Sequence, residues 1–130
     1  MSVINITVST NGNIPIYQQI VKQVTAAILR GDLTAEQALP SIRLLAKELK
    51  ISVITSKRAY EELEKDGFIY TIPGKGSFVA GQSKKVLEDS KYVLVEEKLL
   101  EAISLAKSFD LGKKEVERLL TGLMEGEKWD

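Results

Sequence analysis

Basic side chains are concentrated in one short stretch of the chain, and groups of this type bind anions. Between Ser41 and Arg58 five basic residues stand against Glu48 alone, a local charge of +4, although the whole chain balances 18 Lys and Arg with 18 Asp and Glu. Guanidinium and ammonium groups bind phosphate oxygens through charge-assisted hydrogen bonds. The basic residues of this candidate surface are Arg43, Lys47, Lys50, Lys57 and Arg58.

The residues needed for common catalytic chemistry are largely missing. The chain has no Cys and no His, which removes thiol nucleophiles, disulfides, Cys/His zinc sites and the commonest general base. The best match to a phosphate loop of an enzyme is Gly74-Lys75-Gly76-Ser77, but its glycine spacing is wrong and it precedes a strand instead of opening a helix. We therefore expect no enzymatic activity, no metal and no cofactor.

Two helices joined by a tight turn are expected to position the basic side chains. Ser41 and Ser52 each suit an N-cap, because a serine hydroxyl accepts a hydrogen bond from an amide of the first helical turn. The first helix should end near Leu49 and the second should continue until Gly67. Apolar and small residues at helical spacing form the inward rows, which are Ile42, Leu45, Ala46 and Leu49, then Ser56, Ala59, Tyr60 and Leu63.

Elements of other kinds flank this helical pair. The alternation over residues 3–8 predicts a strand, and residues 15–30 predict a helix that Gly31 ends as a left-handed cap. Two β-rich stretches, 68–72 and 77–80, enclose a turn and predict a hairpin.

The order of these elements predicts a mainly α fold with a small β-hairpin wing. Residues 1–82 are expected to form a winged helix-turn-helix domain, which inserts the N-terminal part of its second helix into the major groove of DNA. Lys75, between two glycines at the hairpin tip, can approach the DNA backbone. The residues expected to contact double-stranded DNA are Ser41, Arg43, Lys47, Ser52, Ile54, Thr55, Lys57, Arg58, Gly74, Lys75 and Gly76.

Two alternatives to DNA binding remain open. A basic row on a helix is often no more than a solvated face. A winged helix can also serve as a protein-interaction or RNA-binding module without operator specificity. The basic outer faces and the lack of exposed aromatic stacking residues favour duplex DNA over single-stranded RNA.

The C-terminal part is expected to be helical and to join two copies of the chain. Residues 83–91 are polar and predict a linker, and residues 92–126 predict two helices around Asp110-Leu111-Gly112. Their apolar bands are too broad for one helix of the same chain to cover, so a homodimer would bury both. The expected interface residues are Tyr92, Val95, Leu99, Ile103, Ala106, Val116, Leu119, Leu120 and Leu123. Alternatively, the helical pair folds back on the first domain and completes its core.

Several short motifs follow one another in a fixed order between residues 14 and 79. They are Pro15-Ile16-Tyr17-Gln18-Gln19-Ile20, Leu39-Pro40-Ser41-Ile42-Arg43-Leu44-Leu45-Ala46, Thr55-Ser56-Lys57-Arg58-Ala59-Tyr60-Glu61-Glu62-Leu63, Gly67-Phe68-Ile69 and Gly74-Lys75-Gly76-Ser77-Phe78-Val79. In this order they resemble the winged helix-turn-helix of the GntR family of bacterial transcription regulators, specifically its short YtrA-type subfamily.

The resemblance implies roles for individual residues and for the whole chain. It implies that Arg43 contacts DNA and that Ser52, Thr55 and Lys57 lie at the DNA groove. It also implies that Gly74 and Lys75 belong to the wing. It also implies a short helical dimerisation segment and control of neighbouring transporter genes. We therefore expect a dimeric repressor acting at a palindromic operator, with any small-molecule effector unassigned. The chain departs from the family at Val53, where many members carry Arg, so sequence specificity must come from elsewhere.

The sequence favours a cytoplasmic location without a membrane partner. Residues 1–10 carry neither the basic nor the apolar region of a secretory signal, and apolar runs elsewhere are far shorter than the ~20 residues of a membrane helix.

Overall fold

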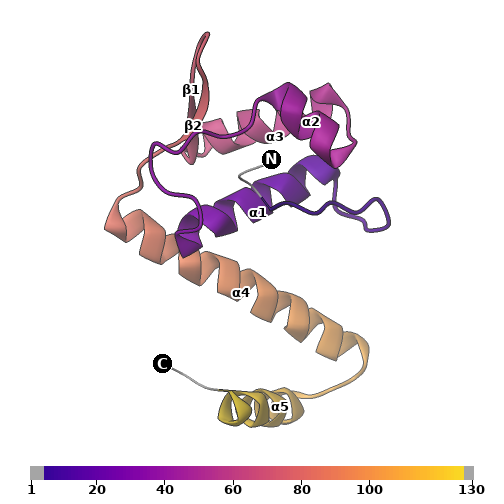
Figure 1. Cartoon of the computed structure of the whole chain (residues 1–130). Helices are drawn as coiled ribbons and strands as arrows, with labels where there is room; N and C mark the ends of the chain where they lie inside the picture. The colour runs from indigo at the N-terminus through magenta and orange to yellow at the C-terminus, as the bar shows by residue number, and fades with distance from the viewer. Residues whose placement is uncertain (1–4, 128–130) are drawn as a thin grey trace. The chain divides into compact units, whose positions relative to one another are not determined.

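The structure is a computed structural model that describes residues 5–127 (Figure 1). Its elements are α1 (Ile16–Arg30), α2 (Ile42–Leu49), α3 (Val53–Lys65), β1 (Ile69–Ile72), β2 (Gly76–Val79), α4 (Lys84–Ser108) and α5 (Lys113–Gly126). The expected fold class is confirmed, since a mainly α winged helix-turn-helix with a β-hairpin precedes a helical C-terminal segment. The chain divides into two compact units between Leu87 and Glu88.

Side-chain caps fix the starts of α2 and α3. Ser41 Oγ accepts a hydrogen bond from the Leu44 amide at 3.1 Å, and Ser52 Oγ accepts one from the Thr55 amide at 3.0 Å, as the sequence predicts. Between the two helices Lys50 adopts the left-handed conformation with φ 57°. The turn of the helix-turn-helix therefore spans only the residues from the end of α2 to the cap of α3.

The core of the first unit lies between α1, the helix-turn-helix and the hairpin. Its largest fully buried side chains are Ile20, Val24, Leu45, Ser56, Leu63, Ile69 and Val79. Gly31 ends α1 with φ 85°, as expected for a glycine cap. The inward row predicted for α3 is confirmed, because Ser56 and Ala59 are both 0% exposed. These small residues allow close packing of α3, and the Ser56 hydroxyl is satisfied by the Ser52 carbonyl at 3.2 Å.

Tyr60 ties α3 to the segment that precedes α2. Its hydroxyl donates to the Pro40 carbonyl at 2.7 Å, and both residues are buried. Burial, together with the nearby charge of Glu48, raises the pKa of Tyr60 above its ordinary value. The hydroxyl therefore remains a hydrogen-bond donor at neutral pH.

The hairpin pairs β1 with β2 in antiparallel register, with Ile72 opposite Gly76 at the turn. Tyr70 and Phe78 lie opposite each other and stack, their ring centroids 5.6 Å apart. The short strands are thus held by an aromatic cross-strand pair as well as by their backbone.

A further stretch of backbone before α2 pairs with β2. The Glu36 amide donates to the Val79 carbonyl at 2.8 Å, and the Leu39 amide donates to the Ser77 carbonyl at 2.9 Å. Glu36 adopts the left-handed conformation with φ 71° at the start of this stretch, and its carboxylate accepts a hydrogen bond from the Tyr70 hydroxyl. These bonds attach the hairpin to the segment that leads into α2.

The expected strand over residues 3–8 is wrong for the part that the structure describes. Residues 3 and 4 lie outside the described range, and residues 5–8 are not in a strand. In place of a partner strand, side-chain amides of α1 pair with this backbone. Gln23 bonds the amide and the carbonyl of Thr7 at 3.0 and 2.7 Å, and Gln19 does the same for Ser9 at 2.9 and 2.8 Å.

The expected linker over residues 83–91 is also wrong as a description of local structure, because α4 begins at Lys84. Ser83 caps this helix by accepting a hydrogen bond from the Val86 amide at 3.1 Å. No Gly or Pro interrupts the chain from there to Gly112, so the polar side chains continue as solvated helix. The division between the two units falls within this segment.

Replacing Tyr60 by Phe should destabilise the first unit. The change removes a buried hydrogen bond and leaves the Pro40 carbonyl without its donor, at a cost of about 1–3 kcal/mol in the free energy of unfolding. Urea unfolding measures this cost. Glu61→Gln, on the exposed surface of α3, is the control and should change stability little. Equal stability of the two variants would contradict the role given to the Tyr60 hydroxyl.

Candidate nucleic-acid interface

The outer side of α3 presents an apolar residue among basic ones. Ile54 is 80% exposed, and Lys57 and Arg58 are exposed about one turn further along the helix. Thr55 is half-buried beside them. These are the residues that the helical spacing places outside, and they lie at the N-terminal half of α3, where the helix dipole adds positive potential.

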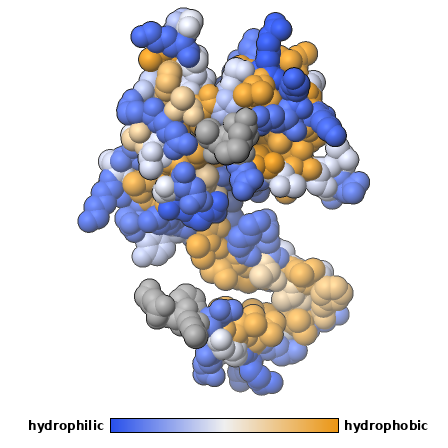
Figure 2. Space-filling view, viewed as in Figure 1, coloured by the Kyte–Doolittle hydropathy of each residue, from blue (hydrophilic) through white to orange (hydrophobic). Residues whose placement is uncertain are grey.

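α2 and its C-cap add further basic residues, since Arg43 and Lys47 on the helix and Lys50 at the cap are all exposed. None of these three forms an ion pair within residues 5–127, and neither does Lys57. Hydrophilic surface gathers over the upper part of the first unit in Figure 2, with apolar patches between. The positive charge of this surface is therefore not neutralised by carboxylates of the described chain, and it is available to an external anion.

The two cap serines, Ser41 and Ser52, make hydrogen bonds within the protein in addition to any contact with DNA. The Ser52 hydroxyl accepts from the Thr55 amide and donates to Thr55 Oγ1 at 2.8 Å. The Ser41 hydroxyl accepts from the Leu44 amide, and its own proton bonds to no acceptor within residues 5–127. Of the two, Ser41 is thus the better placed to donate to a phosphate.

The wing carries its lysine on a glycine turn. Gly74 and Gly76 have φ values of 79° and 124°, a region that side chains disfavour, and the Lys75 amide closes the turn on the Ile72 carbonyl at 2.9 Å. Lys75 is exposed at the tip. Only glycine on both sides allows this turn without strain, which leaves the lysine free to extend.

One contact of this surface was not anticipated from the sequence. The Arg58 guanidinium carbon lies 4.3 Å from the ring centroid of Tyr17 on α1, and Arg58 Nη2 donates to the Tyr17 hydroxyl at 3.3 Å. Arg58 Nε also pairs with Glu62 at 3.4 Å. Helical spacing identifies residues that share one helix face, but it contains no signal for a contact between residues 41 positions apart.

The second unit presents apolar side chains to solvent along both of its helices. No residue of α4 or α5 is buried, and hydrophobic surface follows both helices in Figure 2. Of the residues expected at a dimer interface, Ala106 and Val116 are half-buried. The others are exposed, namely Tyr92, Val95, Leu99, Ile103, Leu119, Leu120 and Leu123.

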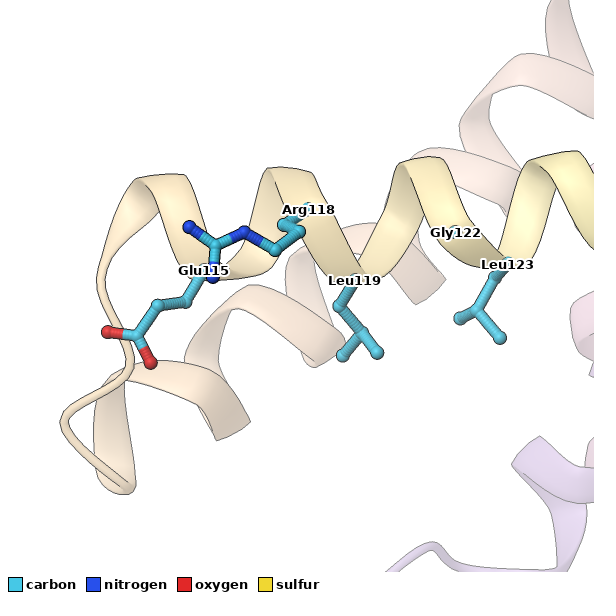
Figure 3. Close-up of a pocket in the computed structure, with 5 residues that line it drawn as sticks. All are labelled: Glu115, Arg118, Leu119, Gly122 and Leu123. Carbon is cyan, nitrogen blue, oxygen red and sulfur yellow. The ribbon is translucent and has the colours of Figure 1, made fainter.

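α5 also borders an open hollow of about 430 Å³. Leu119, Gly122 and Leu123 line it along the helix, with Glu115 and Arg118 at one end (Figure 3). A Cβ added at Gly122 would meet no atom within 4 Å, so no contact within the described chain explains a glycine in the middle of this helix. The residues lining the hollow all come from one helix, an open arrangement unlike the concave pockets that enclose small ligands.

Across residues 5–127 no helix is both long and apolar enough to cross a membrane.

The sequence of the first unit matches a known protein family. Residues 16–79 match the family model described as bacterial regulatory proteins, gntR family. The HTH-type transcriptional repressor YtrA of Bacillus subtilis is 33% identical over 98 residues, which cover 75% of each chain. The matched relatives are named as transcriptional regulators and not as enzymes.

Solved structures extend the similarity beyond the first unit. A GntR family transcriptional regulator from Listeria monocytogenes has a TM-score of 0.71 at 28% identity, covering 86% of this chain and 97% of that one. AraR(DBD), crystallised in complex with an operator, has a TM-score of 0.50 at 25% identity, covering 59% of this chain and 94% of that one.

Proposed function

The chain belongs to the GntR family of bacterial regulatory proteins, as a DNA-binding transcriptional regulator with a repressor of the YtrA type among its relatives, and we propose that it is a dimeric repressor of a palindromic operator. The observation that carries this proposal is the exposed basic surface of α2 and α3, whose lysines and Arg43 have no carboxylate partner in residues 5–127. An unpaired cationic surface on a helix-turn-helix suits the phosphates that flank a major groove.

In the proposed complex the N-terminal half of α3 enters the major groove. We infer that Ile54 faces the groove, where an apolar side chain suits a thymine methyl, and that Lys57 contacts base edges or phosphates. Arg43 and Lys47 on α2 face the adjacent backbone, with Lys75 approaching from the wing. The full proposed contact set is Ser41, Arg43, Lys47, Ser52, Ile54, Thr55, Lys57, Arg58, Gly74, Lys75 and Gly76.

The proposed dimer uses the apolar bands of α4 and α5. Monomeric proteins rarely leave so many large apolar side chains exposed on neighbouring helices. The hollow beside Gly122 provides room for an apolar side chain of a second copy. A two-fold pair of helix-turn-helix units reads half-sites about 34 Å apart or a multiple of that distance, which corresponds to a palindromic operator.

Repression by occupying a promoter is the output that we propose, because the relative YtrA is named a transcriptional repressor. We place the operator near the chain's own gene and, from the subfamily resemblance, near genes for a transporter. A reporter driven by that promoter should rise in expression when the chain's gene is deleted. Expression that falls on deletion would indicate an activator instead.

Arg43→Ala and Lys57→Ala should each weaken binding to a duplex that carries the promoter region upstream of the chain's own gene. We expect a loss of about tenfold for each, with a salt dependence flatter by about one phosphate contact. The free energy of unfolding should stay within about 0.5 kcal/mol of the original, because both side chains are exposed. Fluorescence titration at several salt concentrations measures the affinity.

Lys65→Ala is the matched control, since Lys65 is an exposed lysine at the opposite end of α3. It should bind the duplex as the original chain does. Equal weak binding of the original chain to the promoter duplex and to an unrelated duplex of the same length would contradict operator recognition there.

Leu99→Glu combined with Leu120→Glu should convert the proposed dimer to monomers and weaken operator binding. Each change would place an unpaired charge in an apolar interface. Sedimentation velocity measures the oligomeric state. Leu105→Glu is the control, because Leu105 is 60% exposed on α4 but lies off the interface band. Dimers that survive the double change would show that the interface has been assigned to the wrong residues.

A further inference from the structure

Arg58 is held in place in the free protein by contacts from two helices. Its guanidinium lies over the Tyr17 ring at 4.3 Å, and its Nη2 group donates to the Tyr17 hydroxyl at 3.3 Å. On the other side its Nε group pairs with a Glu62 carboxylate oxygen at 3.4 Å. The ring contributes a cation–π attraction, and the two oxygens fix the rotation of the guanidinium plane.

The guanidinium retains donors for an external anion. Of its five N–H groups, one bonds to Tyr17 and one to Glu62, and no further partner occurs among the described residues. The Arg58 side chain is 55% exposed. A planar group with free N–H donors suits a phosphate, which accepts two parallel hydrogen bonds from one guanidinium.

The position of Arg58 on α3 favours a phosphate over a base edge. Arg58 lies one turn beyond Ile54, and its guanidinium is drawn toward α1 by Tyr17. The base edges lie on the floor of the major groove and face the first turn of the inserted helix, whereas a group at the flank meets the sugar-phosphate wall.

We propose that Tyr17 is a positioning residue for DNA binding, which holds Arg58 in the orientation that contacts a backbone phosphate. The inference rests on the proposed function and adds α1 to the elements that determine operator affinity. A free arginine side chain loses rotamer entropy when DNA immobilises it. Tyr17 already restricts the Arg58 rotamers in the free protein, so less entropy is lost on DNA binding. Removing Tyr17 should therefore weaken binding without any contact between Tyr17 and DNA.

A double-mutant cycle tests whether Tyr17 acts through Arg58. The variants are Tyr17→Leu, Arg58→Gln and the two combined, titrated with the promoter duplex and with an unrelated duplex at several salt concentrations. Arg58→Gln should weaken binding to both duplexes about tenfold and flatten the salt dependence by about one contact. Tyr17→Leu should weaken binding about threefold, and the double variant should bind like Arg58→Gln alone.

Tyr17→Phe separates the ring from the hydroxyl. It retains the cation–π contact and loses the 3.3 Å hydrogen bond from Arg58, together with one that the hydroxyl accepts from Gln18 Nε2 at 3.2 Å, so its affinity should lie between those of the original chain and Tyr17→Leu. Urea unfolding of each variant accompanies the titrations, which are made under conditions where every variant is folded.

The possible outcomes distinguish this inference from the proposed function. Failure of the original chain to bind duplex DNA would overturn both. Normal binding by the original chain, with Tyr17→Leu causing the same threefold loss in the Arg58→Gln background, would overturn only the positioning role. A Tyr17→Leu loss confined to the promoter duplex would also overturn it, because a phosphate contact is independent of sequence.

Discussion

The close packing of α3 against α1 and α2 is the constraint on which the rest of the first unit depends. Ser56 and Ala59 are small enough for the neighbouring helices to approach, and Leu63 extends the same buried row toward the hairpin. A helix that buries one row so completely has no freedom to rotate about its axis. The direction of Ile54 and Lys57 is therefore set by residues on the opposite side of the helix, which themselves make no contact with solvent.

The β-hairpin wing is also held by the core of the first unit, but mainly through backbone hydrogen bonds and not through close helix packing. Its attachment to the segment before α2 uses backbone amides and carbonyls from residues 36–39 and β2, together with the buried Val79 side chain. Because this pairing uses backbone groups, it does not restrict which side chains the hairpin carries on its outward side. The tip can thus carry whatever residue suits its ligand, here Lys75, while the base of the hairpin stays fixed.

The sequence predicted local features well and distant contacts poorly. The caps at Ser41, Ser52 and Gly31 depend on neighbours a few residues away, so residue type and spacing were sufficient to place the helix ends. The strand expected over residues 3–8 is wrong for residues 5–8, where side chains from α1 take the place of a partner strand. The linker expected over residues 83–91 is wrong as local structure, because polar residues suit an exposed helix as well as a linker. The contact between Tyr17 and Arg58 depends on how α1 packs on α3, which no local pattern specifies.

The N-terminal segment is held to α1 by the side chains of Gln19 and Gln23, and the side chains of the segment itself take no part in these four hydrogen bonds. Each glutamine amide uses one N–H donor and its carbonyl acceptor on one residue of the segment, so a single side chain copies the hydrogen-bonding edge of a strand. The bonds go to the backbone of Thr7 and Ser9, whatever side chains those positions carry. Any residue except proline, which lacks the backbone N–H, can therefore stand at these two positions without loss of pairing, whereas a change to glutamate in α1 would remove the donor and break the match.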